Sequence, residues 1–325
     1  MAKMDLYRET LEKYLKALGP AEDAEISWEY FRAFYKGLAD LGFTELLTME
    51  ETDQAQVWQT VARALMGTGH IALALGFLWQ AGVNRSVLEN LVEASPEAKN
   101  LSERLVQGDI YLNCPWLTEN NEEELYPLTF GKPEEKFLVF EQEGDGQRVF
   151  LASLQEGFSA YTERFGWAGV REVRLNKGEK VLTDREYLGR ISTESLKSIR
   201  NLENFFLLAC SVELAYQAWK AGFRYSQERR QFGRKLWEFQ VLQHSLAEAY
   251  SKYQVVNVAF QELTEHFSRT QRISEGSEVI KGVALAFLRE ITDRALQVHG
   301  GSGYMREYPV QRFWRDGMLL SLYSF

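Results

Sequence analysis

Apolar residues recur at helical spacing over most of the chain and at strand spacing only in its middle. After about residue 195, apolar positions three and four apart form three long stripes, over 205–219, 239–256 and 280–298. Helices with one wide apolar face each bury those faces by packing against one another. The spacing therefore predicts a C-terminal helical bundle over residues 191–325.

The first hundred residues also show helical periodicity. Four segments predict helices: 4–18, 27–41, 54–81 and 85–105. The first ends at Gly19-Pro20, a pair that stops helices, and Pro96 marks a boundary between shorter helices in the last segment. We therefore expect an N-terminal helical domain over residues 1–107.

The middle of the chain changes to a two-residue period. Two apolar runs, 137–140 and 149–152, flank Glu143-Gly144-Asp145-Gly146, which predicts two strands joined by a turn. Apolar alternation continues at Val170, Val173 and Leu175. The predicted fold is thus mainly α with a small β domain over residues 108–190.

Composition excludes several classes of protein. The chain has 325 residues with 37 Lys and Arg against 46 Asp and Glu, a net charge of −9, and no dense basic stripe, which argues against nucleic-acid binding. Its two cysteines and four histidines show no metal-ligand spacing, so we expect no metal. The longest apolar run, Ile71 to Trp79, is about half of a membrane span, and the polar N-terminus lacks signal-peptide character. These features predict a cytoplasmic protein that does not enter a membrane.

A first candidate site lies where the first bundle helix is expected to end, at Glu228-Arg229-Arg230-Gln231-Phe232-Gly233. Two adjacent guanidinium groups beside a glycine can offer forked donors to a phosphate, and Phe232 could stack on a flat ring. The alternative is structural. Arginine is favoured near a helix C-terminus by the helix dipole, and Gly233 would then be the C-cap.

A second candidate site is glycine-rich, at Gln297-Val298-His299-Gly300-Gly301-Ser302-Gly303-Tyr304. Three glycines in four residues let backbone N–H groups approach an anion closely, as a pyrophosphate requires. The spacing is not G-x-G-x-x-G and no strand precedes it, so it is not a Rossmann fingerprint. The alternative is an ordinary glycine loop between two helices.

Taken together, the two motifs resemble those of the acyl-CoA dehydrogenase family. The match lies over about 195–323 and is carried by Arg229, Phe232, Gly233, Gln297, Gly300, Gly301, Gly303, Tyr304, Glu307, Pro309, Val310, Arg315 and Asp316. The resemblance implies a flavoprotein fold with an N-terminal helical domain, a β middle domain and a C-terminal four-helix bundle.

The resemblance also implies a cofactor and its contacts. In the family, these two segments hold the FAD of a neighbouring subunit through its pyrophosphate and adenosine half. By this resemblance, Arg229 would contact phosphate and Phe232, followed by Gly233, would touch the flavin region. The residues implied along the dinucleotide are Gln240, Gln297, Gly300 and Gly301.

The family reaction needs a carboxylate base that removes the α-proton of an acyl thioester while a hydride leaves the β-carbon for the flavin. In most members this base follows the Arg-Asp pair by eight residues, a position held here by Ser324. A minority place it on the first bundle helix, where this chain has Glu203. Asn204 replaces the arginine that often follows. The alternative for Glu203 is a carboxylate near a helix N-terminus, favoured by the dipole.

A further departure concerns the middle domain. The family sequence Thr-Glu-Pro-x-x-Gly-Ser-Asp, which cradles the flavin ring of its own subunit, corresponds here to residues 111–120, where Thr118-Glu119 is present but Gly-Ser-Asp is missing. Three interpretations follow: a dehydrogenase with Glu203 as base, a subunit that completes a partner's FAD site and does little chemistry itself, or a fold reused for non-redox chemistry. The first two predict an acyl-CoA substrate and either a homologous partner or a homo-oligomer. They also imply electron transfer to an electron-transferring flavoprotein.

Overall fold

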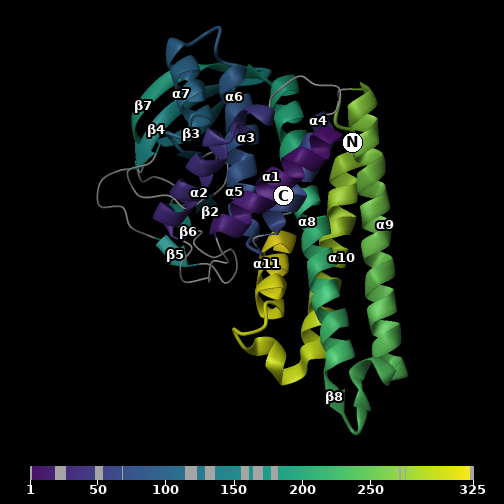
Figure 1. Ribbon diagram of the computed structural model, residues 1–325. Helices are drawn as coiled ribbons and strands as arrows, with labels where there is room; N and C mark the ends of the chain where they lie inside the picture. Colours follow the sequence, from purple (N-terminus) through teal and green to yellow (C-terminus); the bar gives the residue numbers. More distant parts are fainter. Residues whose placement is uncertain are drawn as a thin grey trace.

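The computed structural model describes residues 2–18, 27–47, 54–67, 69–113, 123–128, 136–154, 161–163, 171–176, 182–270, 272–274 and 276–322. N-terminal helices pack beside a small β region, and three long helices run down one side of the molecule (Figure 1). The predicted class, mainly α with a small β region, is confirmed. The predicted domain boundaries at 107/108 and 190/191 stay predictions.

The N-terminal part forms short helices whose ends are set by local hydrogen bonds. They are α1 (Ala2–Leu18), α2 (Trp28–Asp40), α3 (Phe43–Leu46), α4 (Gln54–Met66), α5 (Ile71–Leu78), the π-helix η2 (Trp79–Asn84), α6 (Arg85–Glu89) and α7 (Pro96–Val106). Ser27 caps α2 by accepting from the Tyr30 N–H, and Ser95 caps α7 in the same way. Pro96 stands at the start of α7, where its missing N–H is not needed.

The single helix predicted over 54–81 is wrong. The chain breaks after Met66, and Gly69 takes a φ of +74°, which glycine adopts without steric cost. The predicted interruption between 81 and 85 is absent, because the π-helix continues directly into α6. Ile71–Glu89 is apolar and long enough to cross a membrane by length and composition, but 89% of its most apolar window is buried inside the protein.

Strands form two sheets in the middle of the chain. β1 (Leu112–Asn113), β3 (Lys136–Glu143), β4 (Gly146–Leu154) and β7 (Leu182–Ser192) form one sheet in the order β1-β3-β4-β7. β2 (Glu123–Leu128), β6 (Arg171–Asn176) and β5 (Tyr161–Glu163) form the other in the order β2-β6-β5. The predicted hairpin is confirmed, since β3 pairs antiparallel with β4 and Glu143 faces Gly146.

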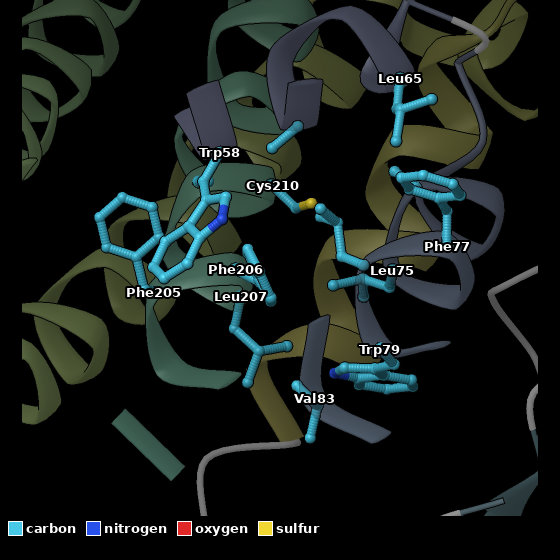
Figure 2. Packing of buried hydrophobic residues seen from close by; sticks show 14 of the residues in the cluster. Trp58, Leu65, Leu75, Phe77, Trp79, Val83, Phe205, Phe206, Leu207 and Cys210 are labelled. Carbon is cyan, nitrogen blue, oxygen red and sulfur yellow. The ribbon is translucent and has the colours of Figure 1, made fainter. Parts of the chain in front are cut away.

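The C-terminal part is built on α8 (Thr193–Glu228), α9 (Gln240–Thr270), α10 (Gly276–His299) and α11 (Val310–Leu322). All eight residues 205–212 of α8 are buried, so this segment is surrounded on every side. Figure 2 shows Phe205, Phe206 and Cys210 of α8 packed among side chains that include Trp58 of α4 and Leu75 of α5. Cys210, which lies within the apolar stripe predicted over 205–219, is buried, and burial raises the pKa of its thiol.

The buried face of α10 differs from the predicted stripe. Val283 belongs to the apolar stripe predicted over 280–298 but is 42% exposed, whereas Lys281, two positions earlier, is only 4% exposed. The buried side of the helix therefore runs through Lys281, Ala284, Leu288 and Ile291. The presence of a charge on this side is taken up below.

Candidate cofactor half-site

The first candidate motif forms a projecting β-hairpin, not a helix cap. α8 ends at Glu228, and the chain then makes two short antiparallel strands, β8 (Arg230–Gln231) and β9 (Arg234–Lys235), before η3 (Leu236–Glu238) leads into α9. Phe232 and Gly233 form the turn with φ of 51° and 80°. Gly233 is thus a turn residue, and the alternative that it caps α8 is wrong.

Phe232 lies at the tip of this hairpin and is 93% exposed. A left-handed conformation is uncommon for a bulky residue, so the turn holds an aromatic ring in solvent at a cost in strain. Figure 1 shows the hairpin extending past the end of the long helices. A strained and exposed ring of this kind is typical of a contact with another molecule.

Several arginines surround the hairpin. Arg224 is paired with Glu228 at 2.8 Å, whereas Arg229 and Arg230 have no carboxylate within 4 Å among the residues that the structure describes. Arg229 lies against Gln231, whose amide oxygen, when turned toward the guanidinium, accepts from Nε at 3.2 Å and from Nη2 at 2.8 Å. This end of the bundle therefore carries positive charge that the surrounding chain does not neutralise.

The second candidate motif follows α10 directly as the short 3-10 helix η4 (Gly300–Tyr304). Its glycines have different environments. A Cβ on Gly303 would come within 2.9 Å of the Leu296 carbonyl oxygen, so Gly303 is required by packing. A Cβ on Gly300 or Gly301 would have no atom within 4 Å. Because Gly301 has neither a crowded Cβ position nor a positive φ, nothing within the described chain requires a glycine there.

Aromatic rings bring the two motifs to the same end of the bundle. Tyr225, in the last turn of α8, stacks on His299, the last residue of α10, with ring centroids 4.2 Å apart. Tyr308, just before α11, meets both rings at 5.6 Å. His299 Nδ1, which carries a proton in this arrangement, donates to the Ala295 carbonyl oxygen at 2.8 Å, and burial lowers the pKa of its imidazole.

The remaining predicted cofactor residues also lie at this end. Gln240 is the first residue of α9, two residues after η3 ends, and Gln297 stands one turn before Gly301; both are exposed. The cofactor half-site is defined here as Arg229, Phe232, Gly233, Gln240, Gln297, Gly300 and Gly301. All seven are exposed, so none of them is sealed inside this chain. Open space above the glycines, unneutralised guanidinium groups and an exposed ring fit the phosphates and flat rings of a dinucleotide.

Glu203 is not part of this half-site. It lies in the third turn of α8, and Arg229 follows it by 26 residues, or roughly 39 Å of helix. Glu203 is half-buried, and the next residue, Asn204, accepts a hydrogen bond from Lys281 Nζ at 2.8 Å. The structure therefore separates the candidate base from the half-site of the same chain, as expected if the two serve different sites.

Two predicted features lie outside the described residues: most of the 111–120 segment, including Thr118 and Glu119, and the terminal segment with Ser324. Among the residues that are described, no group of three or more His, Cys, Asp or Glu side chains could hold a metal ion.

The hairpin and the Lys281–Asn204 contact were not predicted. Glycine at the second position suits a two-residue hairpin turn, but phenylalanine is not a usual residue at the first position, and helical patterns lie on both sides. The burial of Lys281 has no sequence signal, because Val283 beside it suits an apolar face better.

Comparison with known proteins finds a family match for the C-terminal part of the chain. Residues 198–324 match the family model described as "Acyl-CoA dehydrogenase, C-terminal domain". The chain carries an acyl-CoA dehydrogenase C-terminal domain. A curated relative, the caffeyl-CoA reductase-Etf complex subunit CarC of Acetobacterium woodii, is 27% identical over 114 residues. That match covers 35% of this chain and 30% of the relative, so the aligned part spans less than a third of the relative's length.

Solved structures extend the acyl-CoA dehydrogenase fold to the whole chain. Glutaryl-CoA dehydrogenase from Mycobacterium smegmatis matches with a TM-score of 0.74 at 17% identity, covering 100% of this chain and 91% of that one. A structure of a Mycobacterium smegmatis glutaryl-CoA dehydrogenase in complex with FADH2 gives 0.70 at 16% identity, with the same coverage. At these identities the likeness establishes the fold.

Proposed function

We propose that this chain works in the flavin-dependent α,β-dehydrogenation of an acyl-CoA thioester, with its cofactor half-site completing the FAD site of a neighbouring chain. The observation that carries the proposal is the exposed wall at one end of the bundle. There, Gly300 and Gly301 leave open space above the backbone and Arg229 keeps its charge unneutralised. A dinucleotide bound between this wall and a second chain would use all of these features.

Each residue of the wall has a physical role in this proposal. Arg229 offers charge-assisted hydrogen bonds to the phosphates. Gly300 and Gly301 let backbone N–H groups come close to the same anion. Phe232, held in solvent by its turn, packs on the neighbour's flavin region. FAD, when bound, accepts the hydride that leaves the substrate's β-carbon.

Glu203 of this chain is the proposed base. Its place on α8, beside the fully buried segment 205–212, shields one side of it from water. Removal of the α-proton needs the ionised carboxylate within hydrogen-bond reach of that proton. The match to the family domain supports a thioester substrate.

The partners are part of the proposal. The CarC relative is named as a subunit of an Etf complex, which supports an electron-transferring flavoprotein as the acceptor of electrons from this assembly. The neighbour is either a second copy of this chain or a homologous subunit that carries its own flavin cradle. We expect the assembly to act in the cytoplasm, as composition predicts.

A second candidate function is that of a non-catalytic subunit. The sequence favours it at two positions, where Gly-Ser-Asp is missing from the 111–120 region and Ser324 replaces the usual carboxylate. In that case the half-site would contribute to a partner's FAD site, and Glu203 would have no catalytic role and would only favour the N-terminal part of α8 through the helix dipole.

The visible absorption spectrum of the purified chain, measured with its size on the same column, tests these proposals. Flavin near one per subunit, in an oligomer, supports a self-sufficient enzyme. A colourless chain that gains flavin when co-expressed with the products of neighbouring genes supports the heteromeric form. Absence of flavin in both preparations would overturn the proposed function and leave non-redox use of the fold.

A further inference from the structure

Lys281 is a buried charge between two helices of the bundle. It lies on α10 with 4% of its surface exposed, and its Nζ donates to Asn204 Oδ1 on α8 at 2.8 Å. Among the described residues, no carboxylate lies within 4 Å of this ammonium group. Burying an ammonium group is costly unless it is paired. A lysine kept at this position with an amide as its hydrogen-bond partner therefore needs an explanation.

The lysine fixes the orientation of the Asn204 side chain. An ammonium group has three donors and no acceptor, so the carboxamide must face it with its oxygen. The amide nitrogen, Nδ2, is then turned away from Lys281. No residue that the structure describes accepts a hydrogen bond from Nδ2. This nitrogen is also not one of the fully buried polar atoms that lack a hydrogen-bond partner. Asn204 thus presents two N–H donors in a fixed direction, outside the packed core.

These donors stand beside the candidate base, since Asn204 follows Glu203 on α8. Adjacent Cα atoms are about 3.8 Å apart, and their side chains diverge by about 100° around the helix, so the two groups can flank one small ligand. In a thioester the carbonyl oxygen is bonded to the carbon next to the α-carbon, so it lies two bonds from the α-carbon. A group that removes the α-proton and a donor to the carbonyl oxygen must therefore lie close together.

We propose that Asn204 Nδ2 donates a hydrogen bond to the thioester carbonyl oxygen of an acyl-CoA bound beside Glu203, and that Lys281 is the positioning residue that holds the amide in this orientation. The inference rests on the proposed function. When the α-proton passes to Glu203, negative charge develops on the carbonyl oxygen, and a fixed donor with a cation behind it stabilises that charge. The donor keeps its own proton throughout.

Asn204→Asp is the deciding variant. The carboxylate has the shape of the carboxamide and still accepts from Lys281, but it replaces the donor with an acceptor. The probes are the best-oxidised thioester from a panel of butyryl-, octanoyl-, palmitoyl-, isovaleryl- and 3-phenylpropionyl-CoA, and its S-alkyl thioether, in which CH2 replaces the carbonyl. Calorimetry on the intact assembly should show that the wild type prefers the thioester by about 5- to 10-fold, the scale of one hydrogen bond. Asn204→Asp should abolish that preference.

Asn201→Asp is the matched control, because it introduces the same charge one turn earlier on α8. It should keep the preference. Lys281→Met should weaken the preference by freeing the amide to turn, and Lys281→Arg should restore it. If Asn204→Asp binds the thioester over the thioether as strongly as the wild type, with unchanged turnover, the amide has only a structural role and the inference is overturned.

The experiments distinguish failure of the Asn204 assignment from failure of the proposed function. If no thioester in the panel is oxidised by a flavin-loaded assembly, the proposed function fails and the inference fails with it. If oxidation is observed but Asn204→Asp leaves both the binding preference and turnover unchanged, only the assignment of Asn204 fails.

Discussion

Tyr225 and His299 stack with their ring centroids 4.2 Å apart, and this contact joins the ends of the two helices that carry the cofactor half-site. The two residues are 74 positions apart in the chain. Their stacking, with Tyr308 against both rings, places the glycine loop at the same end of the bundle as the hairpin. The half-site is therefore assembled by packing at the end of the bundle and not by a continuous motif.

Loss of the Arg229 guanidinium should weaken flavin binding in the assembly. Charge-assisted hydrogen bonds contribute about 1.5–3 kcal/mol, so Arg229→Ala should lower affinity by roughly 10- to 150-fold. Flavin per assembly, measured by absorbance after dialysis, checks this. Arg224→Ala is the control, because Arg224 is already paired with Glu228 at the same end. Full flavin occupancy in Arg229→Ala would show that Arg229 does not contribute to flavin binding.

Glu203→Gln should abolish turnover if this chain supplies the base. The amide keeps the shape of the side chain but cannot accept the α-proton at neutral pH. The rate of flavin reduction by acyl-CoA, followed by absorbance in a stopped-flow instrument, is the measurement. Flavin content should stay unchanged. Wild-type rates in this variant would assign the base to a partner and support the non-catalytic interpretation.

Gly301→Ala should separate cofactor binding from folding. A Cβ at this position has no atom within 4 Å, so the variant should unfold at the wild-type temperature as a flavin-free chain. It should bind flavin more weakly, because the methyl group occupies space above the backbone. Gly303→Ala should do the reverse and lower the unfolding temperature, since its Cβ meets the Leu296 carbonyl oxygen at 2.9 Å. Equal flavin affinity in Gly301→Ala and the wild type would contradict the assignment of Gly301 to the cofactor half-site.

Acid should destabilise the protein partly through His299. Burial lowers the pKa of its imidazole from the ordinary value of 6.5. The unfolded chain therefore takes up this proton before the folded chain does, and stability is lost as the pH falls from about 7 toward 5. His299→Phe keeps the stacked ring but removes the titration. Its unfolding temperature should fall less over this pH range than that of the wild type, and parallel curves would disprove the prediction.

Gly282→Ala should stabilise the isolated chain. Gly282 lies inside α10, is exposed, and its Cβ would have no atom within 4 Å. Replacing an exposed glycine in a helix interior with alanine gains about 0.5–1 kcal/mol. The measurement is the midpoint of urea unfolding, compared between the variant and the wild type when both show the same dependence of the unfolding free energy on urea concentration. A loss of stability would mean that α10 is distorted at this position.

Much of the architecture could be predicted because local patterns carry it. The helical spacing and the capping residues Ser27 and Ser95 define helices, and Gly144 with Gly146 marks the one hairpin turn that was expected. The break after Met66 was missed because the apolar pattern continues through it. The face of α10 was misjudged because Lys281 is buried where an apolar residue would be expected.

The sequence by itself determined most of the helical and β segments and the two chemical motifs. These depend on residue type and on spacing along the chain. The tertiary structure alone decided which glycines are open to a ligand and that Phe232 is held in solvent at a hairpin tip. The physical reason is that exposure, close approach and orientation depend on which helices pack together, and residues far apart in the chain, such as Asn204 and Lys281, meet only after that packing has formed.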